Sequence, residues 1–272
     1  MSHRPLTQPG FWPHTGNINF CEPDYEVSHY IAEFWNSVSS IPMILTGVFG
    51  MCLARWQHLG PEQMACYFGV GLVGCGSFAF HATLMRTGQI ADEVPMLWSI
   101  LFLLYAARQH SLDRQSRVTR STSISTRLFV LRCALIAYAA IATCLYFFSG
   151  FGVFIMLYGV SVAVLVVYAV YSLFTGTPPA GAQPRRLLAA AALAYGGGVV
   201  CFWLPSELLC DRAPLLRRLP LHALFHLTSA AGPHLGCTAF ALARFEHEKA
   251  VARPSAWFAG LPAIERGLCK QV

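Results

Sequence analysis

The 272-residue chain is 55% hydrophobic and only 12% charged, with a mean hydropathy of +0.49. Soluble domains carry about 25% charged residues, so this composition excludes an ordinary soluble protein and indicates one embedded in a membrane. The net charge of +6 would suit a nucleic-acid partner, but the positions of the basic residues favour a different explanation.

Apolar segments recur along the whole chain, and seven of them approach or reach the roughly 20 residues that a helix needs to cross a bilayer. We therefore predict an all-α polytopic membrane protein, a bundle of seven transmembrane helices. The N-terminal stretch MSHRPLTQPGFWPHTG has no basic region followed by an apolar core, so we expect no cleavable signal peptide. The predicted spans are about 34–54, 64–85, 92–107, 128–148, 151–174, 187–204 and 219–243.

Most lysines and arginines fall on one side of this arrangement. The loops at 55–63, 108–127 and 175–186 and the tail at 244–272 hold most of them. Positive charge collects on the cytosolic side of membrane proteins. The N-terminus is therefore expected on the lumenal or extracellular side and the C-terminus in the cytosol, and the basic excess does not indicate nucleic acid.

Oxygen-bearing side chains gather in the N-terminal segment, residues 1–33. Asn19, Glu22, Asp24 and Glu33 lie in NINFCEPDYEVSHYIAEFWN, just before the first span. Carboxylate, amide and backbone oxygens are the ligands that calcium prefers. The segment predicts a calcium site, although the pattern also fits a solvated acidic stretch ahead of a membrane helix.

Most of the ten cysteines lie inside the predicted spans. Cys21 and Cys210 alone fall in loops on the non-cytosolic side, where oxidation is permitted. We predict a disulfide between them, with two free thiols as the alternative.

Ionisable groups inside membrane spans are costly and usually mark function. The second span ends with GSFAFHATL, which carries Ser77 and His81, and the third begins at QIADEVPM with Asp92. The seventh begins at LHALFHLTSA with His222 and His226. In the predicted topology all these groups lie at one depth, near the lumenal end.

Three histidines with a fourth position left to solvent are the usual ligand set of catalytic zinc. His222 and His226 are spaced i and i+4, so they project from one face of a helix. Taken singly, each group has another explanation: His81 as a hydrogen-bonding residue between helices, Asp92 as a helix N-cap, and Ser77 as a packing residue. Their joint depth favours a zinc site.

Zinc lowers the pKa of bound water and polarises a carbonyl oxygen. A carboxylate such as Asp92 can take the proton of that water and pass it to the leaving group. A hydroxyl such as Ser77 can stabilise the developing oxyanion. The residues alone therefore predict a zinc hydrolase that acts on a lipid carbonyl.

Four motifs together resemble the alkaline ceramidase family. These are CEPDYEVSHYIAEFWNSVS, GSFAFHATL, QIADEVPM and LHALFHL. Members of that family are seven-helix membrane hydrolases that cleave the amide of ceramides into a sphingoid base and a fatty acid. The resemblance implies that His81, His222 and His226 are zinc ligands, that Asp92 is the acid/base and that Ser77 supports the oxyanion.

The resemblance also implies a calcium site, in a regulatory or structural role. Glu22 and Glu33 match calcium ligands, and the carbonyl of Phe20 stands where the family often has Trp. Asn19 occupies a position that is commonly Asp, and Asp24 one that is commonly Asn. The two exchanges cancel in charge.

A second departure lies before the last span. Ser206 stands where an Asp often follows Trp203 by three residues, and Glu207 is beside it. The loop between Cys210 and His222 is short. These differences bear on calcium affinity and substrate entry more than on the zinc chemistry.

The sequence thus predicts hydrolysis of ceramide, dihydroceramide or phytoceramide by a zinc-activated water, in the endoplasmic reticulum or Golgi membrane. The partner is a membrane lipid, with no nucleic acid and no obligate protein partner. Two alternatives remain: a related seven-helix lipid esterase or phospholipase, and a non-catalytic seven-helix receptor with structural zinc.

Overall fold

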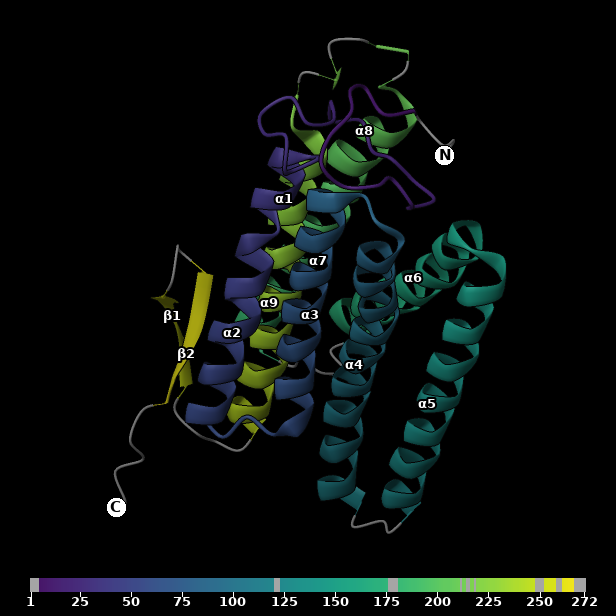
Figure 1. The fold of residues 1–272 in the computed structure, drawn as a ribbon. Helices are drawn as coiled ribbons and strands as arrows, with labels where there is room; N and C mark the ends of the chain where they lie inside the picture. Colours follow the sequence, from purple (N-terminus) through teal and green to yellow (C-terminus); the bar gives the residue numbers. More distant parts are fainter. Residues whose placement is uncertain are drawn as a thin grey trace.

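The structure is a computed structural model that describes residues 5–119, 123–175, 181–210, 212–213, 216–217, 219–247, 252–257 and 261–266. Helices hold most of these residues, which confirms the predicted all-α class (Figure 1). In chain order they are α1 (Phe34–Ser39), α2 (Ile41–Trp56), α3 (Pro61–Thr83), α4 (Arg86–Thr119), α5 (Ser123–Ser149), α6 (Phe151–Thr175), α7 (Ala182–Gly198), a π-helical turn (Val199–Trp203), α8 (Leu204–Leu208) and α9 (Leu221–His247). A short antiparallel hairpin, β1 (Ala252–Trp257) and β2 (Leu261–Arg266), follows α9.

Six helical stretches within the described residues are long and apolar enough to cross a membrane. They correspond to the first six predicted spans. The third begins at Arg86, earlier than the predicted residue 92, so its start was predicted wrongly. The six are Phe34–Trp56, Pro61–Thr83, Arg86–Gln109, Thr126–Ser149, Phe151–Ser172 and Ala182–Leu208.

The seventh predicted span corresponds to α9, which has 27 residues but is not among these six. His222, His226, Pro233 and His234 interrupt its apolar sequence. The reason lies in its position, because α9 packs inside the bundle against α2, α3, α4 and α7. A helix that faces other helices need not be apolar on every side. The seventh crossing stays a prediction.

The outer helices differ from the inner ones in how much of their surface other helices cover. In the most apolar part of Arg86–Gln109 in α4, 56% of the residues are buried, whereas in that of Thr126–Ser149 in α5 only 6% are. In Figure 1, α5 and α6 stand to one side of the group formed by α2, α3, α7 and α9. Their exposed apolar side chains are the surface that lipid would cover.

Glycines let α3 approach its neighbours closely. A Cβ atom at Gly47 of α2 would lie 2.5 Å from the Cα atom of Gly71 in α3. One at Gly76 would lie 1.9 Å from the carbonyl oxygen of Ala91 in α4. Small residues at such crossings are typical of membrane helices. The second crossing brings α3 and α4 together next to Ser77 and Asp92.

The N-terminal segment covers the end of the bundle where α3 finishes, next to α1 and α8 (Figure 1). The amides of Ala32 and Glu33 donate to the carbonyl oxygens of Ala82 and His81, each at 2.9 Å. These bonds satisfy carbonyl groups that the end of a helix leaves without intrahelical partners. A disulfide joins Cys21 to Cys210 across 189 residues of sequence, so the segment is fastened to the end of α8.

Candidate metal centre and active site

Three buried histidines form a cluster that could hold a metal ion. His81 comes from α3, and His222 and His226 come from the first two turns of α9. One ligand atom from each lies within 4.8 Å of the others, and no other such group of His, Cys, Asp and Glu occurs among the described residues. The fold thus brings together the three histidines that were predicted to lie at one depth. We call them the three-histidine cluster.

The Nδ1 atom of each imidazole faces a partner outside the cluster. That of His81 contacts a carboxylate oxygen of Glu33, and that of His222 lies 3.3 Å from Oε1 of Glu207. The Nδ1 of His226 lies 3.1 Å from the carbonyl oxygen of Asn36. Since Nδ1 of each ring faces one of these oxygens outside the cluster, Nε2 is the atom left to face its centre. A histidine that binds a metal is usually oriented in this way.

Ser77 lies directly beside the cluster. Its Oγ is 3.5 Å from Nε2 of His226 and 2.9 Å from Oγ of Ser40. The side chain is 1% exposed, and the close approach of α3 and α4 at Gly76 fixes its position. Ser77 is thus held at the inner side of the cluster, where a ligand would meet it.

Asp92 was predicted to lie at the start of its helix. It lies instead in the second turn of α4, which begins at Arg86. This position rules out the alternative in which Asp92 serves as the N-cap. The residue is 8% exposed and lines a cavity together with Ser77, His222 and His226. Asp92 therefore lines the same cavity as His222 and His226 of the three-histidine cluster.

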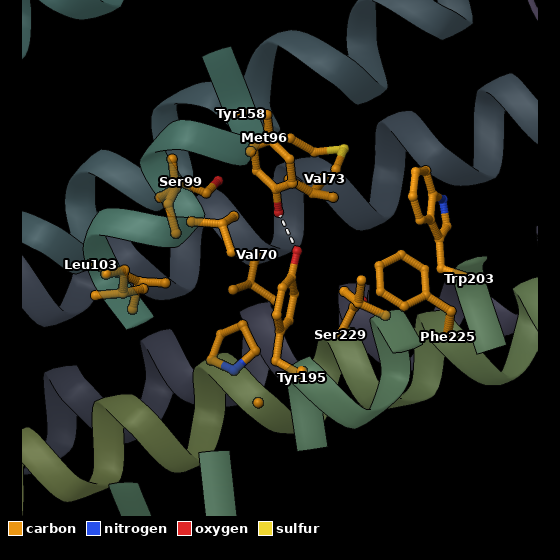
Figure 2. A pocket seen from close by; sticks show the side chains of 18 of the residues that line it. Val70, Val73, Met96, Ser99, Leu103, Tyr158, Tyr195, Trp203, Phe225 and Ser229 are labelled. Atoms are coloured by element: carbon orange, nitrogen blue, oxygen red, sulfur yellow. Dashed lines mark hydrogen bonds between the residues drawn. The ribbon is translucent and has the colours of Figure 1, made fainter. Parts of the chain in front are cut away.

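The cavity has a volume of about 330 Å³ and extends from the cluster between the helices. Its walls are mainly aliphatic and aromatic, with Val70, Leu103 and Phe225 among them (Figure 2). The hydroxyls of Tyr158 and Tyr195 meet at 2.5 Å, in the hydrogen bond drawn in Figure 2. Such a chamber, apolar with a polar end, suits a hydrocarbon chain attached to a polar group.

The expected calcium ligands also lie close together; we call Asn19, Phe20, Glu22, Asp24 and Glu33 the acidic N-terminal cluster. The amide of Phe20 donates to Glu33 Oε1 at 2.9 Å, and Nδ2 of Asn19 donates to Asp24 Oδ2 at 3.2 Å. Both oxygens of Glu22 accept backbone amides of α1, from Trp35 at 2.6 Å and Asn36 at 2.8 Å. Glu22 therefore caps α1.

Burial raises the pKa of Glu22 to about 7 and that of Glu33 to about 8, because the charged forms lose solvation. Asp24 is 1% exposed, and its Oδ1 accepts no hydrogen bond from the described residues. A buried carboxylate oxygen without a donor is a place where a cation fits. The residues present are thus compatible with calcium.

Sequence reasoning missed the partners of the imidazoles. Ser39, Ser40 and the carbonyl of Asn36 surround Nδ1 of His226, yet nothing in their spacing marks them. The sequence marked Glu207 only as the neighbour of Ser206, a position at which this chain differs from the family. A carboxylate shortly before the last helix was the one available signal for it, whereas the Tyr158–Tyr195 contact had none.

Comparison with known proteins gives a consistent result. A sequence model of the ceramidase family matches residues 12–265. The chain is similar to alkaline ceramidase of Arabidopsis thaliana, with 29% identity over 219 residues covering 80% of each chain. It is also similar to alkaline ceramidase 1 of Mus musculus, with 23% identity over 92% of this chain and 91% of that protein. With alkaline ceramidase 3 of Mus musculus it is 38% identical over 97 residues, which are 35% of this chain and 36% of that protein.

Proposed function

The chain belongs to the ceramidase family, and from this we propose that it hydrolyses the N-acyl amide of a ceramide to a sphingoid base and a free fatty acid. Ceramide, dihydroceramide and phytoceramide are the substrates in view. One observation carries the proposal. The three-histidine cluster meets a buried, largely apolar cavity that Ser77 and Asp92 also line.

The donor set fits zinc, because three neutral imidazole nitrogens leave a fourth position open. The partners of Nδ1 on His81, His222 and His226 support this interpretation, since they leave Nε2 available in each ring. A zinc ion in this position would supply Lewis-acid activation of the amide carbonyl and of a water molecule.

The side chains around the cluster supply the remaining chemistry. Asp92 takes the proton of the attacking water and passes it to the nitrogen of the sphingoid base as the amide bond breaks. Ser77 donates a hydrogen bond to the carbonyl oxygen as negative charge develops on it. The apolar walls hold the acyl chain and exclude water from side reactions.

The acidic N-terminal cluster is proposed to bind calcium, with Asn19, the carbonyl of Phe20, Glu22, Asp24 and Glu33 as ligands. The orphaned Oδ1 of Asp24 supports this. Calcium takes six to eight oxygen ligands in flexible geometry, which a cluster of this composition can provide. Its role would be to stabilise the segment that carries Glu33.

We also propose the cellular arrangement: an endoplasmic reticulum or Golgi membrane, with segment 1–33 in the lumen, 34–243 as the catalytic domain and 244–272 in the cytosol. The excess of basic residues in the loops on the opposite side from the N-terminus supports this orientation. The lipid substrate would reach the site from within the membrane.

Family membership favours amide hydrolysis over the two alternatives, a lipid esterase or phospholipase and a receptor with structural zinc. To test it, the full-length protein is purified and supplied with ceramide or with a phospholipid, and the released fatty acid and sphingoid base are measured. Ceramide should be cleaved and phospholipid should not. Cleavage of phospholipid in place of ceramide, or bound metal without turnover of either lipid, would overturn the proposal.

The role of Asp92 is tested in the same assay by Asp92→Asn, which keeps the shape of the side chain but removes its basicity. We expect kcat to fall about 10²–10⁴-fold, the usual contribution of a general acid–base, while bound zinc is retained. Glu26→Gln, at an exposed position in the N-terminal segment, serves as the control. An unchanged rate in the Asp92 variant would remove Asp92 from the mechanism.

A further inference from the structure

One carboxylate beside the three-histidine cluster has no role in the mechanism above. Oε1 of Glu207 lies 3.3 Å from Nδ1 of His222, and this buried nitrogen has no hydrogen-bond partner of better geometry among the described residues. The two side chains are 2% and 7% exposed, so the contact is closed to solvent. Glu207 does not line the cavity, and its carboxylate meets the three-histidine cluster at the ring of His222.

Local structure holds Glu207 in place. A π-helical turn, Val199–Trp203, directly precedes α8. Such a turn contains an extra residue, which changes the direction in which the following side chains project, and it is frequent at functional sites. The Oγ of Ser206 lies 2.9 Å from Oε1 of Glu207 and 2.8 Å from the carbonyl oxygen of Trp203. Its single proton can be donated to either.

The far end of this segment is fixed as well. Cys210, three residues after Glu207, is fully buried and bonded to Cys21. The amide of Leu209 donates to the carbonyl oxygen of Pro205 at 3.1 Å, which closes the last turn of α8. The backbone at Glu207 is thus held on both sides, by the π-helical turn before it and the disulfide after it.

We propose that Glu207 is the positioning residue of His222: it accepts the Nδ1 proton and so holds Nε2 toward the metal. The inference rests on the proposed zinc site and concerns how that site keeps its metal. A carboxylate that accepts the second ring proton of a metal-bound histidine fixes the tautomer and the ring orientation and makes the ligand nitrogen more basic. Loss of such a partner typically weakens metal binding about 10–100-fold.

The test measures the zinc dissociation constant of the purified full-length protein by competition with a chelator. Glu207→Ala removes the acceptor and should weaken zinc binding by roughly 10–100-fold. Glu207→Gln keeps an acceptor without the charge and should weaken binding less. Glu26→Gln is the matched control and should bind zinc as the wild type does. At saturating zinc, the KM for ceramide should stay within about twofold of wild type in every variant, since Glu207 does not line the cavity.

Ser206→Ala keeps the test decisive if the Glu207 variants fail to fold. It removes one hydrogen bond to Glu207 and leaves the carboxylate in place, so we expect a smaller loss of zinc affinity, about 2–5-fold, consistent with a bond worth about 1 kcal/mol or less. Wild-type zinc affinity in the Glu207 variants, or in Ser206→Ala where those do not fold, overturns the positioning role. A wild-type protein that binds no zinc overturns the proposed function itself, so the two failures are distinguishable.

Discussion

The three-histidine cluster and the acidic N-terminal cluster both gather ligand atoms, but they use those atoms differently. In the first, Nδ1 of each ring faces an oxygen outside the cluster, and Nε2 of His226 makes a hydrogen bond with Oγ of Ser77 at 3.5 Å. In the second, both oxygens of Glu22 cap α1, and those of Glu33 face Phe20, Asn36 and His81. The imidazoles leave ligand atoms close together that could hold an ion, whereas the carboxylates already stabilise the fold.

Because of this difference, an ion bound at one cluster should change a different property of the protein from an ion bound at the other. At the three-histidine cluster, the proposed zinc ion would supply chemistry, and its loss should reduce turnover more than stability. At the acidic N-terminal cluster, buried carboxylates repel each other and lack solvation, so calcium should act mainly on stability. Glu33 belongs to the second cluster and contacts the first, which gives the two a common residue.

The largest expected effect comes from removing an imidazole. His222→Ala should abolish bound zinc and lower ceramide turnover at least about 10³-fold, because the metal site loses one of its three ligands. Metal content of the purified protein and kcat are the measurements. The control is His234→Gln on the same helix. His234 is buried and does not belong to the cluster; its Nδ1 lies 3.2 Å from the hydroxyl of Tyr67. Equal metal loss in both variants would contradict the assignment.

Much of this contrast could be predicted from the sequence. Uncharged runs interrupted by His81, His222 and His226 place three imidazoles at one depth, because helix length and bilayer thickness fix how far a residue lies along a span. The i, i+4 spacing fixes the common face of two of them. Helical geometry alone fixes both the depth and the shared face, so both could be predicted from the sequence.

The remaining features depend on contacts between segments far apart in sequence. Glu207 meets His222 only because α8 returns to the start of α9, and Asp92 lies in the second turn of α4 because that helix begins at Arg86. Hydropathy alone could not place that start, since GQIADE carries polar residues within the helix. The position of α9 inside the bundle likewise explains why it is less apolar than the six helices that hydropathy identifies as possible spans.

The next largest effect is expected from removing the disulfide between Cys21 and Cys210, which joins the N-terminal segment to the end of α8. Cys210→Ser removes the bond to Cys21, which stands between Phe20 and Glu22, and should destabilise the protein by about 2–4 kcal/mol. We expect weaker zinc binding as well, since the link also fixes the segment of Glu207. Thermal unfolding and chelator competition measure the two effects. Cys201→Ser, at a free thiol in the same part of the chain, should change neither.

If Cys210→Ser lowers stability but leaves zinc affinity at its wild-type value, the disulfide serves the N-terminal segment alone. If it changes neither stability nor zinc affinity, packing alone holds the two clusters together and the disulfide contributes to neither.

A smaller effect is expected at the cap of α1. Glu22→Gln leaves one oxygen to accept an amide and replaces the other with a donor that faces a backbone N–H. The cost should be about 0.5–2 kcal/mol, as for other lost helix caps, with bound zinc unchanged. Thermal unfolding and metal content are measured on the same preparation. Loss of zinc without loss of stability would reverse the roles assigned to the two clusters.

The smallest effect is a dependence of stability on pH. The pKa of Glu22 is raised by burial to about 7 and that of Glu33 to about 8, both above the usual 4.5. A carboxyl group with a raised pKa contributes stability that is present below about pH 4.5 and is lost as the pH rises through the folded-state value. With a calcium-selective chelator present, the melting temperature should therefore fall by a few degrees between about pH 4.5 and 8, the range between the unfolded-state and folded-state pKa values. Added calcium should remove most of this decline, because it binds the ionised forms, and Glu22→Gln should show a shallower decline from the start. Parallel curves with and without calcium would show that the acidic N-terminal cluster binds no calcium, and would leave the carboxylates with their structural role alone.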